Sequence, residues 1–146
     1  GWALYAERLA WEMDWYQDDP YGDLGRLQAE AFRAARLVID PGIHAMGWSF
    51  DQAVDYMVEN VGYEDGDIVN PEYEVARYVV WPGQATAYKI GMLKILELRQ
   101  MAMDRLGDRF DLKEFHNVVL SNGSMPLELL ERVVNDYIEA ELNQGA

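Results

Sequence analysis

The chain has 146 residues, half of them apolar and a quarter charged, which is the composition of one globular domain rather than a disordered chain. Twelve Lys and Arg against 26 Asp and Glu give a net charge of −14, which argues against nucleic acid and anionic membranes as partners. The lack of cysteine excludes disulfides and thiolate zinc sites, and no apolar run approaches the roughly 20 residues that span a bilayer.

Apolar residues recur at helical spacing from the start of the chain, and the first two predicted helices cover residues 2–16 and 24–39. The first is expected to end at the Asp18-Asp19-Pro20 turn, and the second to begin after Asp23 as N-cap and to stop at Pro41-Gly42. Its apolar stripe is predicted to be Leu24, Leu27, Ala31, Ala34 or Ala35, and Val38.

The next two helices are marked by capping residues. Ser49 and Gln52 have the spacing of a capping box, which predicts a helix from about Ser49 to Asn60 with Val54, Met57 and Val58 buried. Asn70-Pro71 provides an N-cap followed by a proline at the first helical position, which predicts a helix over 71–80. Trp81-Pro82-Gly83 then breaks the chain.

Three more helices are predicted after this break, over 84–106, from Asp111 to 121 and over 126–142. The first is apolar on most sides, with Ile90, Leu93 and Met101 among its apolar residues, and is expected to be central to the fold. No sustained period-2 pattern indicates a strand. We therefore expect an all-α chain of about seven helices, in which residues 1–146 form a single helical domain or a fragment of a larger catalytic domain.

Negative charge is concentrated in the middle of the chain. Between Arg36 and Arg77 there is no Lys or Arg but there are nine acids: Asp40, Asp51, Asp55, Glu59, Glu64, Asp65, Asp67, Glu72 and Glu74. Such a stretch is typical of a solvated face, and alternatively it binds cations or a basic partner. The segment Glu64-Asp65-Gly66-Asp67 lacks the ligand register of an EF-hand, so calcium is only weakly indicated.

Self-contained catalytic motifs are absent from the sequence, and only two histidines occur. His116 shares a helical face with apolar residues and is interpreted as a hydrogen-bonded core residue. His44 lies in a predicted non-helical, glycine-containing segment, 41–48, where a site histidine is plausible beside a structural or capping role.

Five polar residues flank the Trp81-Pro82-Gly83 break, namely Arg77, Tyr78, Gln84, Tyr88 and Lys89. Arg77 and Lys89 are suited to bind a carboxylate, and a tyrosine hydroxyl is suited to stabilise an oxyanion. Pairing of Arg77 with Glu74 or another helical acid on the surface is the alternative.

Several blocks of this sequence together resemble a bacterial domain-of-unknown-function family of gluzincin-like zinc metallopeptidases. The similarity covers nearly the whole chain and is carried, in order, by residues 1–7, 33–40, 42–44, 47–49, 74–78, 82–91, 98–99, 110–111, 115–116, 123 and 126–127. The resemblance implies that the chain corresponds to the C-terminal, helical part of a protein several times longer. Its partners would then be the upstream part of the same protein and a peptide-like substrate.

The resemblance also implies a zinc ion in the full-length parent, held by two histidines and a glutamate that would immediately precede Gly1. A catalytic zinc needs three protein ligands, so we expect no metal site in this chain alone, which would form one wall of the active-site cleft. On this reading Tyr78 or Tyr88 and His44 face the oxyanion, Arg77 or Lys89 binds a substrate carboxylate with Gln84 beside them, and Glu7 is structural or supports a ligand.

Two expectations remain beside this one. The chain is alternatively a non-catalytic acidic helical module that binds a protein partner, or an excised fragment whose tryptophans stay partly uncovered. Because any export signal would lie upstream of Gly1, the sequence leaves open whether the protein is cytoplasmic or exported.

Overall fold

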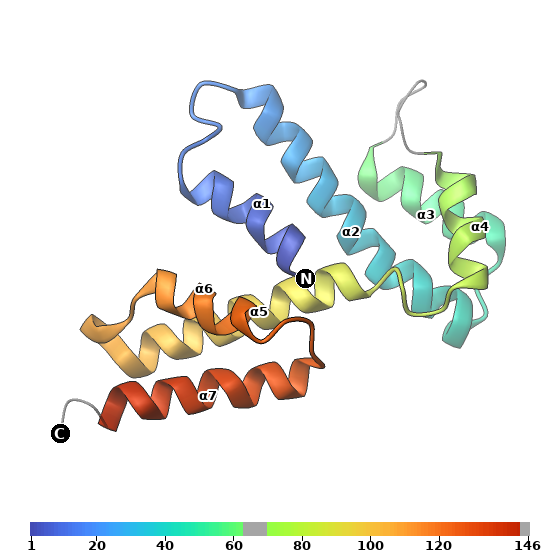
Figure 1. The fold of residues 1–146 in the computed structure, drawn as a ribbon. Coiled ribbons are helices and arrows are strands. Elements are labelled where there is room, and N and C mark those ends of the chain that lie inside the picture. Colours follow the sequence, from blue (N-terminus) through green and yellow to red (C-terminus); the bar gives the residue numbers. More distant parts are fainter. Residues whose placement is uncertain (63–69, 144–146) are drawn as a thin grey trace. The chain divides into compact units, whose positions relative to one another are not determined.

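The computed structural model describes residues 1–62 and 70–143, which form seven α-helices, one 3-10 turn and no strand (Figure 1). The helices are α1 (Trp2–Glu12), α2 (Pro20–Met46), α3 (Phe50–Val61), α4 (Pro71–Val80), α5 (Ala87–Leu106), α6 (Leu112–Ser121) and α7 (Leu127–Asn143), with the 3-10 turn at Gly107–Arg109. The predicted all-α class is thereby confirmed. The weak calcium candidate at residues 64–67 lies outside the described residues.

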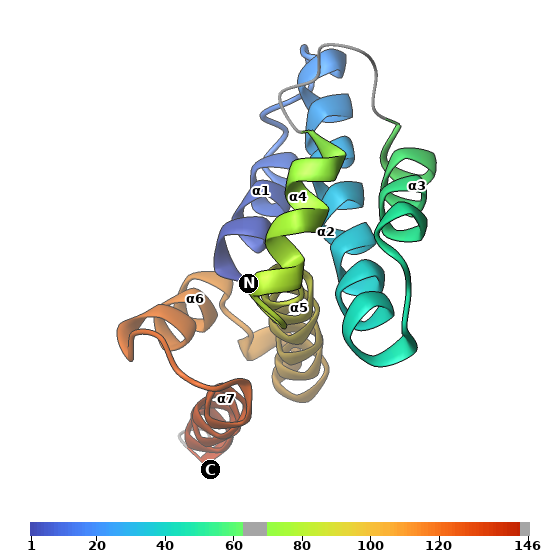
Figure 2. The same cartoon turned by 90° about the vertical axis from the view of Figure 1, so that its right-hand side faces the viewer.

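The chain divides into two compact units, Gly1–Met92 and Leu93–Ala146, and the boundary falls within α5. In the first unit α2 contacts α1, α3 and α4, and Figure 2 shows α1 and α3 on opposite sides of α2. Its core cluster consists of Ala35, Ile39, Ala53, Met57, Val61, Val75, Tyr78 and Ala85. This core therefore fixes α4 and the α4–α5 connection against α2.

In the second unit α6 packs on α7. The α5 and α7 helices are further joined by ion pairs from Lys94 to Glu131, at 2.9 Å, and from Arg105 to Glu139. The buried side chains of this unit are Ile95, Leu98, Ala102, Leu106, Phe115, Val119, Leu130, Val134 and Ile138. In the part of the chain that the structure describes, no helix is both long and apolar enough to cross a membrane.

Three predicted helix starts are confirmed by their caps. Ser49 and Gln52 form the reciprocal capping box at the start of α3. The Asn70 side chain accepts a hydrogen bond from the Tyr73 N–H, and Pro71 is the first residue of α4. Asp111 accepts from the N–H groups of Lys113 and Glu114 at the start of α6. These caps use groups within four residues of one another, which is why the sequence reveals them.

The prediction that α2 stops at Pro41-Gly42 is wrong, because the helix continues to Met46 with Pro41 inside it. Pro41 lies on the exposed face, and Gly42 is buried beneath Trp48, whose ring atoms would lie 2.6 Å from a Cβ at that position. The helix ends at Gly47 in the left-handed region (φ 71°), and the Trp48 N–H donates to the Gly42 carbonyl at 2.9 Å. His44 is therefore in the last turn of a helix and not in a loop.

The turn between α1 and α2 also differs from the prediction. The first helix ends at Glu12, and Asp14 adopts a positive φ of 60° that interrupts it before residue 16. The second helix begins at Pro20, and Asp19 rather than Asp23 is its N-cap, accepting a hydrogen bond from the Gly22 N–H at 2.9 Å. The earlier start follows from proline being favourable in a first helical turn.

The buried faces of three helices were only partly predicted. Buried residues of α2 lie between Ala35 and Gly42, where the helix meets the core cluster, whereas predicted stripe residues Leu24, Leu27 and Val38 are exposed. Val58 of α3 and two apolar residues of α5, Ile90 and Leu93, are exposed as well. Periodicity finds a helix, but which of its faces is covered depends on neighbours distant in sequence.

Gly91 of α5 contacts the first residue of the chain. A Cβ at Gly91 would lie 2.7 Å from the Gly1 Cα, whereas a Cβ at Gly25 would have no neighbour within 4 Å. We expect Gly91→Ala to lower the free energy of unfolding by about 1–2 kcal/mol, because overpacking outweighs the gain in helix propensity. Gly25→Ala should raise it by about 0.5–1 kcal/mol. Urea unfolding of both variants measures this, and equal effects would contradict the close contact.

Candidate functional site

The connection between α4 and α5 is held against α2 by a buried carboxylate. The Gly83 N–H donates to both oxygens of Asp40, at 3.1 and 3.0 Å, and Asp40 is 5% exposed. Gly83 has a φ of 79°, a conformation that glycine adopts without strain. Asp40 thereby fixes the turn that separates Arg77 and Tyr78 from Gln84 and Tyr88.

Three of the predicted site residues lie in one hydrogen-bonded cluster. The Gln84 Oε1 accepts from the Arg77 Nη1 at 3.0 Å. The other amino group of Arg77, Nη2, donates to the Glu74 Oε2 at 2.6 Å, and the Tyr78 hydroxyl donates to the same oxygen at 3.0 Å. The predicted alternative, pairing of Arg77 with Glu74, therefore exists together with the contact to Gln84.

Arg36 of α2 completes this cluster and was not predicted as a site residue. It is 4% exposed, and its Nη2 donates to the Gln84 Oε1 at 3.1 Å. Its guanidinium carbon lies 5.0 Å from the centroid of the Tyr88 ring, 5.3 Å from that of Phe32 and 5.4 Å from that of Tyr78. The cluster thus joins α2, α4 and the start of α5.

His44 approaches the same region from the last turn of α2. Its Nε2 donates to the carbonyl oxygen of Tyr78 at 3.0 Å. That carbonyl belongs to the last turn of α4, where helix carbonyl groups lack intrahelical partners. The contact ties α4 to α2 and leaves Nδ1 as the ring nitrogen that is not engaged by Tyr78.

Tyr88 and Lys89 differ in what surrounds them. The half-buried Tyr88 ring has the guanidinium groups of Arg36 and Arg33 near its face, the latter at 5.7 Å, and no hydrogen bond of its hydroxyl is found within residues 1–62 and 70–143. Lys89 instead forms an ion pair with Glu30 at 2.5 Å. Lys89 therefore lies in a separate ion pair rather than with Arg77.

The protonation of Tyr78 follows from its surroundings. Burial raises the pKa of Tyr78 well above its ordinary value, the charge of Arg36 opposes this shift, and Glu74 adds to it. The hydrogen bond with Glu74 also raises the pKa of Arg77. Near neutral pH Tyr78 is therefore a neutral donor, directed at a carboxylate and flanked by two guanidinium groups.

Sequence reasoning missed Arg36, Asp40 and Glu74, which organise the cluster. The usable signal was that Arg36 and Asp40 are spaced by one helical turn and adjoin the buried residues Ala35 and Ile39. Glu7, expected to be structural, has an Oε2 that is buried without a hydrogen-bond partner. His116 is half-buried, with its ring 5.9 Å from that of Phe115.

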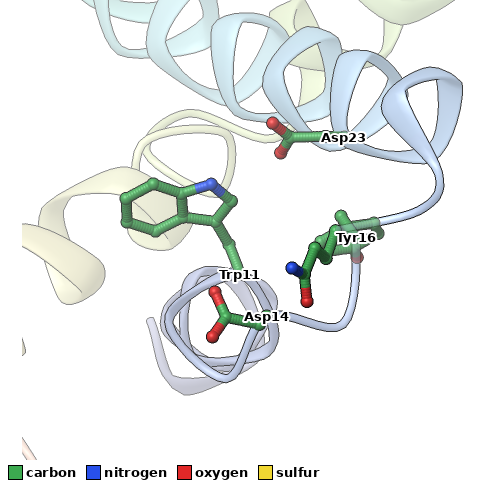
Figure 3. Close-up of a pocket in the computed structure, with 5 residues that line it drawn as sticks. Trp11, Asp14, Tyr16 and Asp23 are labelled. Carbon is green, nitrogen blue, oxygen red and sulfur yellow. The ribbon is translucent and has the colours of Figure 1, made fainter.

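A separate hollow of about 190 Å³ lies at the turn between α1 and α2 (Figure 3). It is lined by Trp11, Asp14, Tyr16, Gln17 and Asp23, none of which was predicted as a site residue. Asp23 is paired with Arg26 at 2.7 Å, and the Arg26 guanidinium lies 5.6 Å from the Trp11 ring. The charge of Asp23 is thus already compensated by a neighbouring side chain.

Metal ligands were examined against the zinc expectation. Nowhere in the described ranges do three or more His, Cys, Asp or Glu residues gather in a way that could hold a metal ion. The donor set present here therefore does not fit a zinc site.

Comparisons with known proteins place the chain among bacterial sequences. The family model described as "Bacterial protein of unknown function (DUF885)" matches residues 1–134. A solved structure titled "The crystal structure of the putative lipoprotein from Colwellia psychrerythraea" is 54% identical with a TM-score of 0.90. The match covers 96% of this chain and 23% of that one, so this chain spans about a quarter of its relative. No curated protein matches.

Proposed function

Because the chain belongs to the bacterial family of unknown function DUF885, we propose that it forms part of a zinc-dependent peptidase. In this proposal it is the C-terminal, helical wall of the active-site cleft and is inactive alone. The zinc ligands and the rest of the cleft come from the upstream part of a longer polypeptide, and the substrate is a peptide or a peptide-like molecule. The match to only 23% of the solved relative supports a longer parent.

The observation that carries the proposal is the convergence of polar groups at the α4–α5 connection. Arg77 and Gln84, on opposite sides of the break, share one hydrogen bond, and Arg36 reaches the same amide oxygen. Such a group of cationic donors beside tyrosine hydroxyls is suited to bind a carboxylate and to stabilise negative charge on a reacting carbonyl.

The geometry favours different roles for the two tyrosines. The Tyr78 hydroxyl already donates to Glu74, and this side chain is 1% exposed. Tyr88 is more accessible, and we assign its hydroxyl to the oxyanion. His44 is assigned a positioning role, because its Nε2 is engaged by the Tyr78 carbonyl, and substrate binding is assigned to Arg77 and Gln84.

The compartment is part of the proposal. The solved relative is titled a lipoprotein, and lipoproteins of bacteria are exported. We therefore propose that the native gene product is exported as well.

The experiment is an assay of the native-length gene product for hydrolysis of a mixture of short peptides, with products identified by mass spectrometry. We expect new amino termini to appear, and removal of zinc with a chelator to abolish them until zinc is returned. A fully zinc-loaded protein that leaves every peptide intact would contradict the proposal.

A second candidate function is supported by one face of α3. Asp51, Asp55 and Glu59 are spaced by four residues, are all exposed and have no ion pair with another described residue. An acidic face of this kind suits a basic protein partner. Salt-sensitive binding of a lysine-rich peptide, lost in Asp55→Asn, together with absence of hydrolysis by the native gene product, would favour this non-catalytic module.

A further inference from the structure

Arg36 is a buried cation without a carboxylate partner. It is 4% exposed, its Nε is buried with no hydrogen-bond partner, and no ion pair joins it to any acid of the described chain. Asp40, one turn further along α2, accepts from the Gly83 N–H instead. A buried charge without an opposite charge is costly, so this arrangement indicates an anion that the described residues do not contain.

Gln84 occupies the place where that anion would lie. Its amide oxygen accepts from Arg36 at 3.1 Å and from Arg77 at 3.0 Å, so one neutral acceptor bridges two guanidinium groups. A carboxylate in that position would accept the same hydrogen bonds and also compensate the charge of Arg36. Because Gln84 is exposed, its side chain can turn towards solvent and release both donors.

The surroundings add a second unpaired cation and aromatic walls. Arg33 also has a buried Nε without a partner, and its guanidinium lies 5.5 Å from the Phe32 ring. Together with Tyr88, these rings provide apolar contact for the hydrocarbon part of an organic acid. Arg77 contributes less net charge than Arg36, because Glu74 already pairs with it.

We propose that Arg36 and Arg77 bind the free C-terminal carboxylate of a peptide-like ligand, and that the Gln84 amide oxygen takes its place when the ligand is absent. The choice of a peptide rests on the proposed function, whereas the carboxylate chemistry rests on the cluster alone. The proposal replaces Lys89 by Arg36 as the cation that anchors the carboxylate, since Lys89 is paired with Glu30.

The test is calorimetric titration of the native-length gene product, stripped of metal by a chelator, with N-acetyl-Ala-Ala and with its C-terminal amide. We expect the acid to bind at least about 30-fold more tightly than the amide, because a buried charge pair is lost with the amide. Equal affinities for the two probes would overturn the proposal.

Variants separate a binding role of Arg36 from a structural one. Arg36→Met should abolish the preference for the acid while leaving the thermal midpoint unchanged or raised, because it removes an unpaired buried charge. Arg36→Lys should also lose most of the preference, since an ammonium cannot form the planar two-point contact. Gln84→Ala should tighten binding of the acid, because it removes the competing acceptor. Arg132→Met, at an exposed position of α7, is the matched control and should change nothing.

Three other outcomes are decisive. A lowered midpoint in Arg36→Met, with neither probe bound by the unaltered protein, would assign the missing carboxylate to an acid of the longer polypeptide and overturn the ligand site. Weaker binding in Gln84→Ala would overturn the stand-in role of Gln84. Tight binding of the acid by a protein that hydrolyses no peptide would contradict the proposed function and support this site.

Discussion

Replacing Tyr88 with phenylalanine is expected to lower kcat of the native-length enzyme by about 100- to 1000-fold, with zinc content unchanged. The ring should stay in place, because its contacts with Arg33 and Arg36 involve the face and not the hydroxyl. What is lost is a donor to the charge that develops in the transition state. Steady-state kinetics on a cleaved peptide, with metal analysis of the same sample, measures the effect.

Two tyrosine variants serve as comparisons for Tyr88→Phe. Tyr78→Phe should lose less activity, because its hydroxyl is committed to Glu74. Tyr137→Phe changes a half-buried tyrosine of α7, outside the candidate site, and should leave kcat unchanged. Unchanged turnover in Tyr88→Phe, or a larger loss in Tyr78→Phe, would contradict the assignment of the oxyanion donor.

The second large effect is expected for Asp40→Ala, which should lower the free energy of unfolding by about 2–3 kcal/mol. The buried carboxylate accepts the Gly83 N–H with both oxygens, and its removal frees the α4–α5 connection. Since that connection positions Gln84 and Tyr88, kcat/KM should fall as well. Urea unfolding and kinetics of the same variant measure both quantities.

Two acidic positions provide controls for Asp40→Ala. Asp40→Asn keeps one acceptor oxygen and should be less destabilised. Asp55→Ala changes an exposed acid of α3 and should alter the free energy of unfolding by less than about 0.5 kcal/mol. Equal stability of Asp40→Ala and the unaltered protein would show that the Gly83 contact does not hold the connection.

Features of the fold that depend on nearby residues could be predicted, and those that depend on distant contacts could not. The starts of α3 and α4 are set by Ser49 with Gln52 and by Asn70 with Pro71, each within a few residues. The end of α2 depends on Trp48, which packs against Gly42 and thereby favours continuation of the helix past Pro41. The usual rule that proline ends a helix does not include such a contact.

The candidate site shows the same limit. Arg77 and Gln84 are seven residues apart, and their shared position beside the Trp81-Pro82-Gly83 break is visible in the sequence. Arg36 contacts Gln84 across 48 residues, and Lys89 contacts Glu30 across 59. An arginine in a helix is more often exposed than buried, so nothing local distinguished Arg36 from Arg33 or assigned Lys89 to a separate ion pair.

The central claim is that this helical chain forms the cleft wall of a longer zinc peptidase. The most direct test is the intact mass and zinc content of the native gene product, isolated from its source with an antibody against these residues. The account predicts a mass several times 16.8 kDa and about one zinc ion per molecule. A product near 16.8 kDa, or a longer one that binds no zinc, would contradict it.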